Sequence, residues 1–101
     1  MSGIFVLNVL LFNMFITYVL YSLSFDKIYI GQTNNFERRL VEHNSGNHRY
    51  TKRYIPWQII HTEKFNTRAE AMKREKKLKS HQGRKYIREV LLNVRVRQLP
   101  D

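Results

Sequence analysis

The chain has 101 residues, of which 43% are hydrophobic, so it suits one domain with a modest core and is unlike a wholly disordered chain. It contains no cysteine, which excludes disulfides, thiolate zinc sites and cysteine nucleophiles and fits the reducing cytoplasm. The net charge of +10 predicts a polyanionic partner, with nucleic acid as the first expectation and an anionic membrane surface as the second.

The charge divides the chain into an apolar beginning and a basic body. Residues 1–25 contain no Asp, Glu, Lys, Arg or His, whereas all 18 Lys and Arg residues lie in 27–101. The run from Ile4 to Leu23 is as long as a bilayer-spanning helix, although asparagines interrupt it and its second half is rich in strand-forming residues. A membrane anchor therefore stays open beside a cytoplasmic domain. A cleaved secretory signal is disfavoured, because no basic residue precedes the run and no small-residue cleavage site follows it.

We expect three segments along the chain. Residues 1–13 form an apolar extension, which either precedes the true start of the domain or packs on the domain as an extra segment. Residues 14–93 form the domain itself. Residues 94–101 form a tail that alternates valine with arginine, and this tail is either a short strand or a frayed end.

Three segments have the composition of strands. Residues 15–21 are β-branched and aromatic, and a polar loop connects them to residues 27–31, so these two segments are expected to form a hairpin. Residues 57–65 are the third strand, although their alternation is imperfect.

The second strand carries a motif that organises the rest of the chain. Ile28 and Ile30 alternate with Tyr29, which places the isoleucines on one face and the tyrosine on the other. Gly31 is expected to end this strand, at a point where the backbone turns sharply or passes close to another group.

Three further segments predict helices. Residues 35–45 follow Asn34, which with Glu37 three residues later has the spacing of a capping box. Residues 67–80 open with a second capping box, and residues 84–92 form a last helix that begins after a glycine.

Two of these helices carry polar residues beside or within their apolar stripes. Arg39 and His43 are four residues apart and share one edge of the first helix. Glu75 falls on the same face of the second helix as Met72 and Leu78. A carboxylate on a buried stripe needs a cation, a hydrogen-bond donor or a metal as its partner, and a buried salt bridge is the structural alternative to a functional site.

Residues 48–56 are a basic loop in which cations are interleaved with tyrosines. This composition favours contact with a nucleic-acid backbone and occasional base stacking, whereas a solvated loop is the alternative. The candidate nucleic-acid-binding residues lie in this loop and on the basic helices: Arg38, Arg49, Lys52, Arg53, Lys76 and Lys79.

The order strand, strand, helix, strand, helix, helix, with polar residues at these positions, resembles the GIY-YIG nuclease family, above all its small stand-alone bacterial members. Tyr29-Ile30-Gly31 matches the second half of the name motif. Ile16-Thr17-Tyr18 stands at the first half, and ten residues separate Tyr18 from Tyr29, which is the family's spacing. The resemblance covers roughly residues 15–92. The other matching positions are Arg39, His43, the loop Arg49-Tyr50-Thr51-Lys52, Pro56-Trp57 and Glu75.

Three positions bear on how complete the match is. Ile16 replaces the glycine of the first half-motif, as is common in the small members. Gln32 stands where some family enzymes have a lysine or a water-ordering group. Other members have a late asparagine, for which Asn93 is the only candidate.

The resemblance implies an α+β fold with a small three-stranded antiparallel sheet flanked by about three helices. It also implies an endonuclease that hydrolyses DNA phosphodiester bonds with one divalent metal, Mg²⁺ or Mn²⁺, and no small-molecule cofactor. Glu75 would be the metal's single protein ligand, and Arg39 would hold a phosphate oxygen. Tyr18 would act as general base, Tyr29 would orient the attacking water, and His43 would relay the proton or support the base. The expected role is DNA repair or the processing of branched or damaged DNA.

Two other functions stay open at the level of the sequence. A nucleic-acid-binding module would keep the fold with little or no turnover, and the charge and the basic loop support it. A membrane-anchored basic protein would use the apolar run. The sequence does not choose between DNA and RNA as the substrate, nor between oligomeric states.

Overall fold

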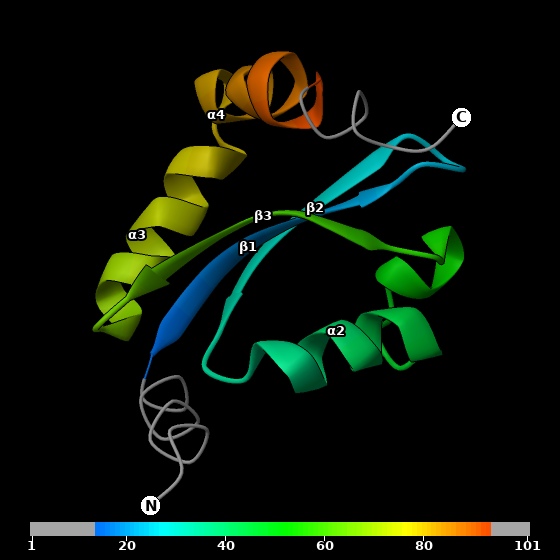
Figure 1. The fold of residues 1–101 in the computed structure, drawn as a ribbon, viewed down its shortest axis with the longest axis horizontal. Coiled ribbons are helices and arrows are strands. Elements are labelled where there is room, and N and C mark those ends of the chain that lie inside the picture. The colour runs from blue at the N-terminus through cyan, green and yellow to red at the C-terminus, as the bar shows by residue number, and fades with distance from the viewer. Residues whose placement is uncertain (1–13, 94–101) are drawn as a thin grey trace, which may run out of the picture.

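The computed structural model describes residues 14–93, so the expectations for residues 1–13 and 94–101 lie outside the described residues. Its elements are β1 (Phe15–Ser22), β2 (Lys27–Thr33), α2 (Phe36–Ser45), the 3₁₀ turn η1 (Thr51–Tyr54), β3 (Gln58–Phe65), α3 (Arg68–Lys79), α4 (His81–Tyr86) and the π-helical turn η2 (Ile87–Leu91). The strands form one antiparallel sheet in the order β2-β1-β3. Helix α2 covers one face, and α3 and α4 lie on the other side (Figure 1). The expected α+β class and antiparallel sheet are confirmed.

The central strand β1 divides the core in two, because successive side chains point to opposite faces. One cluster, here the α2-side core, consists of Tyr18, Leu20 and Trp57, with residues of α2 packed against it. The other, the α3-side core, consists of the aliphatic residues Val19, Ile30, Leu78 and Ile87. The same strand therefore serves two separate packing environments.

The expected alternation in β2 is confirmed, since Ile28 and Ile30 pack with the α3-side core and Tyr29 packs with the α2-side core. The expected end of the strand at Gly31 is wrong, because β2 continues to Thr33 and pairs with β1 throughout. Gly31 faces Tyr18 across the ladder, and a Cβ there would lie 2.6 Å from the tyrosine Oη. The glycine is needed for a close approach, not for a turn.

The imperfect alternation of the third strand has a structural cause. In the ladder between β1 and β3, Val19 pairs with His61 and Leu20 pairs with Ile59, so Ile60 is an extra residue in β3. Such a bulge lets neighbouring residues serve both faces. Ile59 packs against the α2-side core, and Ile60 packs against the α3-side core.

The helix caps agree with the sequence at α3 and differ by one residue at α2. Thr67 caps α3 by accepting a hydrogen bond from the Glu70 backbone N–H at 3.2 Å, as expected. At α2 the cap is Asn35, whose side chain accepts from the Arg38 N–H, so the capping box expected from Asn34 is wrong. Gly46 ends α2 in the left-handed region at φ 85°.

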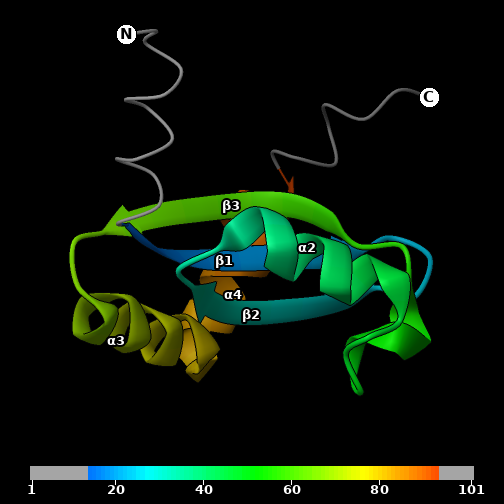
Figure 2. The same ribbon diagram turned by 90° about the horizontal axis from the view of Figure 1, so that it is seen from below.

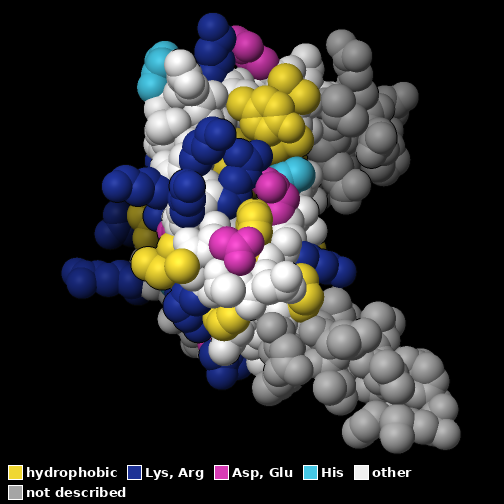
Figure 3. Space-filling model, turned by 90° about the vertical axis from the view of Figure 1, so that its left-hand side faces the viewer, with side chains coloured by type: hydrophobic (Ala, Val, Ile, Leu, Met, Phe, Trp, Pro, Cys, Tyr) yellow, Lys and Arg dark blue, Asp and Glu magenta, His cyan; other side chains and the backbone are white. Residues whose placement is uncertain are grey.

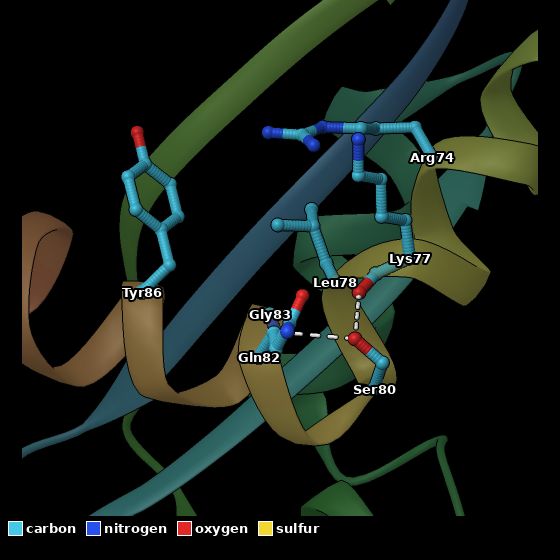
Figure 4. Close-up of a pocket in the computed structure, with 7 residues that line it drawn as sticks. All are labelled: Arg74, Lys77, Leu78, Ser80, Gln82, Gly83 and Tyr86. Atoms are coloured by element: carbon cyan, nitrogen blue, oxygen red, sulfur yellow. Dashed lines mark hydrogen bonds between the residues drawn. The ribbon is translucent and has the colours of Figure 1, made fainter.

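The junction between α3 and α4 differs from the expected break at Gly83. Helix α4 already begins at His81, and Ser80 serves both helices, donating to the Lys77 carbonyl and accepting from the Gly83 N–H (Figure 4). A Cβ on Gly83 would lie 2.3 Å from the Lys77 carbonyl oxygen. This glycine therefore allows the end of α3 to press against α4, and it does not stop a helix.

Membrane crossing was one of the open alternatives. Within residues 14–93, no helix is long and apolar enough to cross a bilayer. The apolar run that raised the alternative lies partly in residues 1–13, outside the described residues, and its second half forms β1.

Candidate active site

A buried tyrosine–histidine pair lies at the centre of the α2-side core. Tyr18 of β1 is 1% exposed, and His43 in the last turn of α2 is fully buried. The Tyr18 Oη lies 2.9 Å from the His43 Nε2, which is a hydrogen bond between residues 25 positions apart. The structure thus brings together two of the residues predicted from the sequence to act in catalysis.

Thr51 holds the other side of this pair. Its Oγ1 lies 2.9 Å from the His43 Nδ1, and its side chain is fully buried. The Thr51 carbonyl accepts a hydrogen bond from Trp57 Nε1 at 2.9 Å. The indole is fixed in turn by Asn44 of α2, whose amide exchanges two hydrogen bonds with the Trp57 backbone. The basic loop is therefore anchored at its first η1 residue and is not simply a solvated loop.

His48 is a second histidine of this network. The Thr51 backbone N–H donates to the His48 Nδ1 at 3.3 Å, so the neutral imidazole carries its proton on Nε2. This Nε2 lies 3.4 Å from the Tyr29 Oη, at the long end of the hydrogen-bond range. Sequence reasoning placed Thr51 and His48 only in the basic loop and assigned neither to the site, and no helical or strand spacing relates them to His43.

Tyr29 lies beside the pair. Its ring centroid is 6.2 Å from that of Tyr18 and 4.6 Å from that of His43. The phenol of Tyr29 is half-buried, whereas the phenol of Tyr18 is enclosed. Tyr29 therefore contacts the buried pair and also keeps part of its own side chain exposed.

The electrostatics keep both members of the pair neutral. Burial raises the pKa of Tyr18 well above its usual value, with a further contribution from Tyr29, and the nearby Arg39 opposes this only in part. Burial, together with the positive charges of His48 and Arg39, lowers the pKa of His43 to about 4. Near neutral pH the hydrogen bond therefore joins a phenol to an imidazole.

Arg39 lies one turn before His43 on α2 and is close enough to both residues to lower their pKa values. Its side chain is 36% exposed, and its Nη1 donates to the Glu42 carboxylate at 2.9 Å. A guanidinium at the surface, beside a buried phenol, is placed to meet an anion that arrives from solvent.

Glu75 approaches from α3, the helix on the other side of the sheet. Its negative charge contributes to the raised pKa of Tyr18, so the two groups are within electrostatic reach. The carboxylate is 21% exposed and receives a hydrogen bond from Lys79 Nζ at 2.7 Å. The expected apolar stripe is therefore only partly correct: Leu78 is buried, but Met72 is 52% exposed. The partner of the carboxylate in this structure is a cation at the surface.

The chemistry of Glu75 fits a hard divalent cation that keeps most of its waters, because such an ion binds through one or two carboxylates. Within residues 14–93, no group of three or more His, Cys, Asp or Glu residues is arranged to hold a metal. Among the described residues a metal at Glu75 would thus have fewer than three such ligands, and Lys79 would have to give up its hydrogen bond to that carboxylate.

The predicted nucleic-acid-binding residues lie in three places. Arg49, Lys52 and Arg53 are exposed on and before η1. Lys76 and Lys79 are exposed on α3, where Lys and Arg side chains gather on the face shown in Figure 3. The remaining residue, Arg38, is 68% exposed on α2 and lies 3.4 Å from the Glu42 carboxylate. The predicted cations are therefore exposed on α2, on α3 and in the segment that contains η1.

A family model described as the GIY-YIG catalytic domain matches residues 14–87. The chain belongs to the GIY-YIG family. The matched range includes all five residues that the sequence predicted as catalytic: Tyr18, Tyr29, Arg39, His43 and Glu75. The family is one of nuclease domains, and the resemblance seen in the sequence is confirmed at this level.

Several relatives of this GIY-YIG chain are known only as UPF0213 proteins, a name that states no activity. One from Natronomonas pharaonis is 42% identical over 54% of this chain and 66% of its own length. One from Enterococcus faecalis is 48% identical over 59% of this chain and 75% of its own length. The chain thus spans just under two thirds of the first of these relatives. A UPF0213 protein from Bacillus halodurans, solved by NMR in solution, is 27% identical with a TM-score of 0.46 and covers 73% of this chain and 81% of its own.

Proposed function

We propose that this GIY-YIG domain hydrolyses phosphodiester bonds of DNA as a metal-dependent endonuclease, in the repair or processing of branched or damaged DNA. The observation that carries the proposal is the buried hydrogen bond between Tyr18 and His43, with Arg39 and Glu75 close enough to alter the pKa of the tyrosine. A purely structural core does not require three polar or charged groups close to one buried phenol, because burying such groups costs desolvation free energy.

In the proposed reaction the attacking water gives a proton to Tyr18 Oη as the phenol proton moves to His43 Nε2. This relay needs Nε2 as the acceptor, so the His43 Nδ1–H donates to Thr51 Oγ1. The depressed pKa of His43 opposes the transfer in the isolated protein. A bound phosphodiester brings a negative charge that offsets the surrounding cations and makes the imidazolium easier to form.

Arg39 and Tyr29 act on the phosphate and on the attacking water beside the tyrosine–histidine pair. Arg39 holds a non-bridging phosphate oxygen and offsets the charge that grows in the transition state. Tyr29, half-buried next to both ring systems, orients the attacking water.

Glu75 would hold a divalent metal such as Mg²⁺ or Mn²⁺, which, when bound, stabilises charge on the scissile phosphate and the leaving oxygen. Lys79, which now hydrogen-bonds to the carboxylate, would be released to contact the DNA backbone. The exchange is reasonable because an exposed ion pair contributes little stability, about 0–1 kcal/mol.

The test compares matched variants on plasmid, branched and single-stranded DNA with Mg²⁺ or Mn²⁺. Tyr18→Phe is expected to lower cleavage by about 10²–10⁴-fold, because the proton acceptor is lost. Tyr21→Phe is the control: this tyrosine lies on the same strand, is 6% exposed and donates to Asp26 on the opposite face, and its loss should leave cleavage within about threefold. Equal effects of the two changes would contradict the proposed role of Tyr18.

Glu75→Gln is paired with Glu63→Gln in the same assay. Glu75→Gln should abolish cleavage while DNA binding survives, since only the metal ligand is removed. Glu63 bonds to Arg74 and His61 and should be dispensable for cleavage. Loss of DNA binding together with cleavage in Glu75→Gln would count against the metal-ligand role.

One observation favours the second candidate, a nucleic-acid-binding module with little turnover. Glu75 is satisfied by Lys79, and Tyr18 is protonated near neutral pH, so neither group is active as it stands. This hypothesis expects salt-dependent DNA binding without products for every substrate and both metals. Cleavage that depends on Tyr18 would exclude it.

A further inference from the structure

A chain of aromatic rings leads from the candidate active site to the surface. The Tyr29 centroid lies 6.4 Å from that of Tyr50, and the Tyr50 centroid lies 5.4 Å from that of Tyr54. The Tyr54 ring lies edge-on to Phe25, with centroids 5.6 Å apart. We call Tyr50, Tyr54 and Phe25 the aromatic track.

The track joins two segments that are distant in sequence. Phe25 belongs to the turn between β1 and β2, and Tyr54 ends η1. Both views of the ribbon place this turn and η1 at the same end of the sheet (Figure 1 and Figure 2). Tyr50 is 47% exposed and Phe25 is 49% exposed, so the track presents ring surface to solvent at both ends.

Positive charge surrounds these rings. Lys27 Nζ lies 5.5 Å from the Tyr54 centroid, and Arg49, Lys52 and Arg53 are exposed beside Tyr50 along the chain. The acidic residue of the turn, Asp26, is neutralised by a 2.9 Å ion pair with Arg88. Exposed rings among cations suit a ligand with flat apolar groups on a polyanionic backbone.

We propose that the aromatic track binds the unpaired bases of a single-stranded DNA segment, so that the substrate of the site carries single-stranded DNA beside the phosphate that is cleaved. This inference rests on the proposed nuclease function for the cleavage, but not for the binding. In a duplex the faces of the bases are covered by their neighbours, and only the backbone is offered to a protein surface. Rings half-exposed at a surface can stack only on bases that have left the duplex.

Binding of bases by the aromatic track also explains why Tyr50 and Phe25 are exposed, which the tyrosine–histidine pair does not require. Tyr54 packs against the α2-side core, which fixes its ring, whereas Tyr50 and Phe25 keep about half of their surface exposed. Exposed aromatic groups held by a partly buried neighbour lose little conformational entropy on binding. The cations Lys52 and Arg53 are then placed to contact phosphates while the rings contact bases.

The test measures binding of a fluorescent oligo-dT and of a duplex of equal length by anisotropy, in EDTA so that no cleavage occurs. The variant Phe25→Leu/Tyr50→Leu keeps apolar volume and charge but removes both exposed rings. It is expected to bind oligo-dT at least about tenfold more weakly and the duplex within about twofold of the wild type. Its salt dependence should be unchanged, because no cation is removed.

Tyr86→Leu is the matched control. This tyrosine is 40% exposed on α4, outside the track, and its loss should leave both affinities unchanged. Urea unfolding of each variant excludes a folding defect as the cause of weaker binding. Equal losses on oligo-dT and duplex, or no loss on oligo-dT, would overturn the proposal, and an oligo-rU bound more tightly than oligo-dT would replace DNA by RNA as the partner.

The outcomes separate this proposal from the nuclease hypothesis. If cleavage depends on Tyr18 but oligo-dT binding is unchanged in Phe25→Leu/Tyr50→Leu, base binding by the aromatic track is overturned and the nuclease hypothesis is retained. If oligo-dT binding depends on the two rings but no substrate is cleaved, base binding by the aromatic track is supported and the nuclease hypothesis is overturned.

Discussion

The two faces of β1 bury different kinds of side chain. On the α3 side Val19 meets Ile30, Leu78 and Ile87, all aliphatic. On the α2 side Tyr18 leads into a buried chain of polar groups that runs through two further elements. An aliphatic core tolerates changes that keep its volume, whereas a buried polar network tolerates none that leave a member without its partner.

The two faces also use glycine differently. Gly31 makes room for the Tyr18 phenol, and Gly83 makes room for the backbone at the end of α3. The first glycine positions a polar atom, and the second brings two helices together. Apart from Glu75, which α3 contributes, the polar groups of the candidate site thus lie on the α2 side of β1, and the following changes test that division.

The largest effect is expected from Ile87→Ala in the α3-side core. Ile87 is fully buried, so its truncation should lower the free energy of unfolding by about 2–5 kcal/mol, measured by urea denaturation. Ile87→Val should cost only about 0.5–1.5 kcal/mol. Because Ile87 lies on the face away from Tyr18, DNA cleavage by the folded variant should stay close to wild type. If Ile87→Val is fully folded and yet cleaves DNA more slowly than the wild type, the two faces are coupled.

The next effect is a loss of stability at acid pH that originates on the α2 side. The pKa of His43 is lowered to about 4 in the folded protein, so the unfolded chain binds a proton more readily between that value and the usual pKa near 6.5. The contribution of His43 to stability is therefore complete above pH 6.5 and is lost as the pH falls to 4. The expected loss between pH 7 and 4.5 is about 2 kcal/mol.

Urea denaturation of wild type and His43→Gln across this range isolates the histidine. The lowered pKa values of His48, Asp26 and Glu63 add their own acid dependence, but equally in both proteins. The variant should show the shallower decline. Parallel curves would mean that His43 does not titrate as a buried neutral group.

Features that depend on a local sequence period could be predicted on both faces of the sheet. Alternation of Ile28, Tyr29 and Ile30 was enough to assign both sides of β2, because a strand has a period of two. The spacing of Arg39 and His43 placed both on one edge of α2. Such local periods account for the strands, the helices and the motif-bearing residues.

The errors arose where a contact crosses between elements. Gly31 could not be assigned to a close approach rather than a strand end, because its neighbour Tyr18 lies on another strand. Gly83 was taken for a helix break, since its packing on α3 leaves no local pattern. Thr51 was assigned to the basic loop but not to the site, because no sequence period links a loop threonine to a helical histidine.

The smallest expected effect on stability comes from substituting two buried threonines, one on each face of β1, and this pair compares the two faces most directly. Thr51 Oγ1 lies 2.9 Å from His43 on the α2 side, and Thr17 Oγ1 donates to the Ala71 carbonyl at 2.8 Å on the α3 side. Thr51→Val and Thr17→Val each remove one buried hydrogen bond at constant volume, so each should lower stability by about 1 kcal/mol. Only Thr51→Val removes the group that sets the position of the proton on His43.

The distinguishing measurement is the pair of ¹⁵N chemical shifts of the His43 ring, which report which nitrogen carries the proton. In Thr51→Val these shifts should move toward a mixture of tautomers, and the acid limb of the pH–cleavage profile should shift with them. Thr17→Val should leave both unchanged, and Thr51→Ser, which restores the hydroxyl, should recover the wild-type shifts. Unchanged His43 shifts in Thr51→Val would reduce Thr51 to a packing residue, since the imidazole would then hold its tautomer through Tyr18 alone.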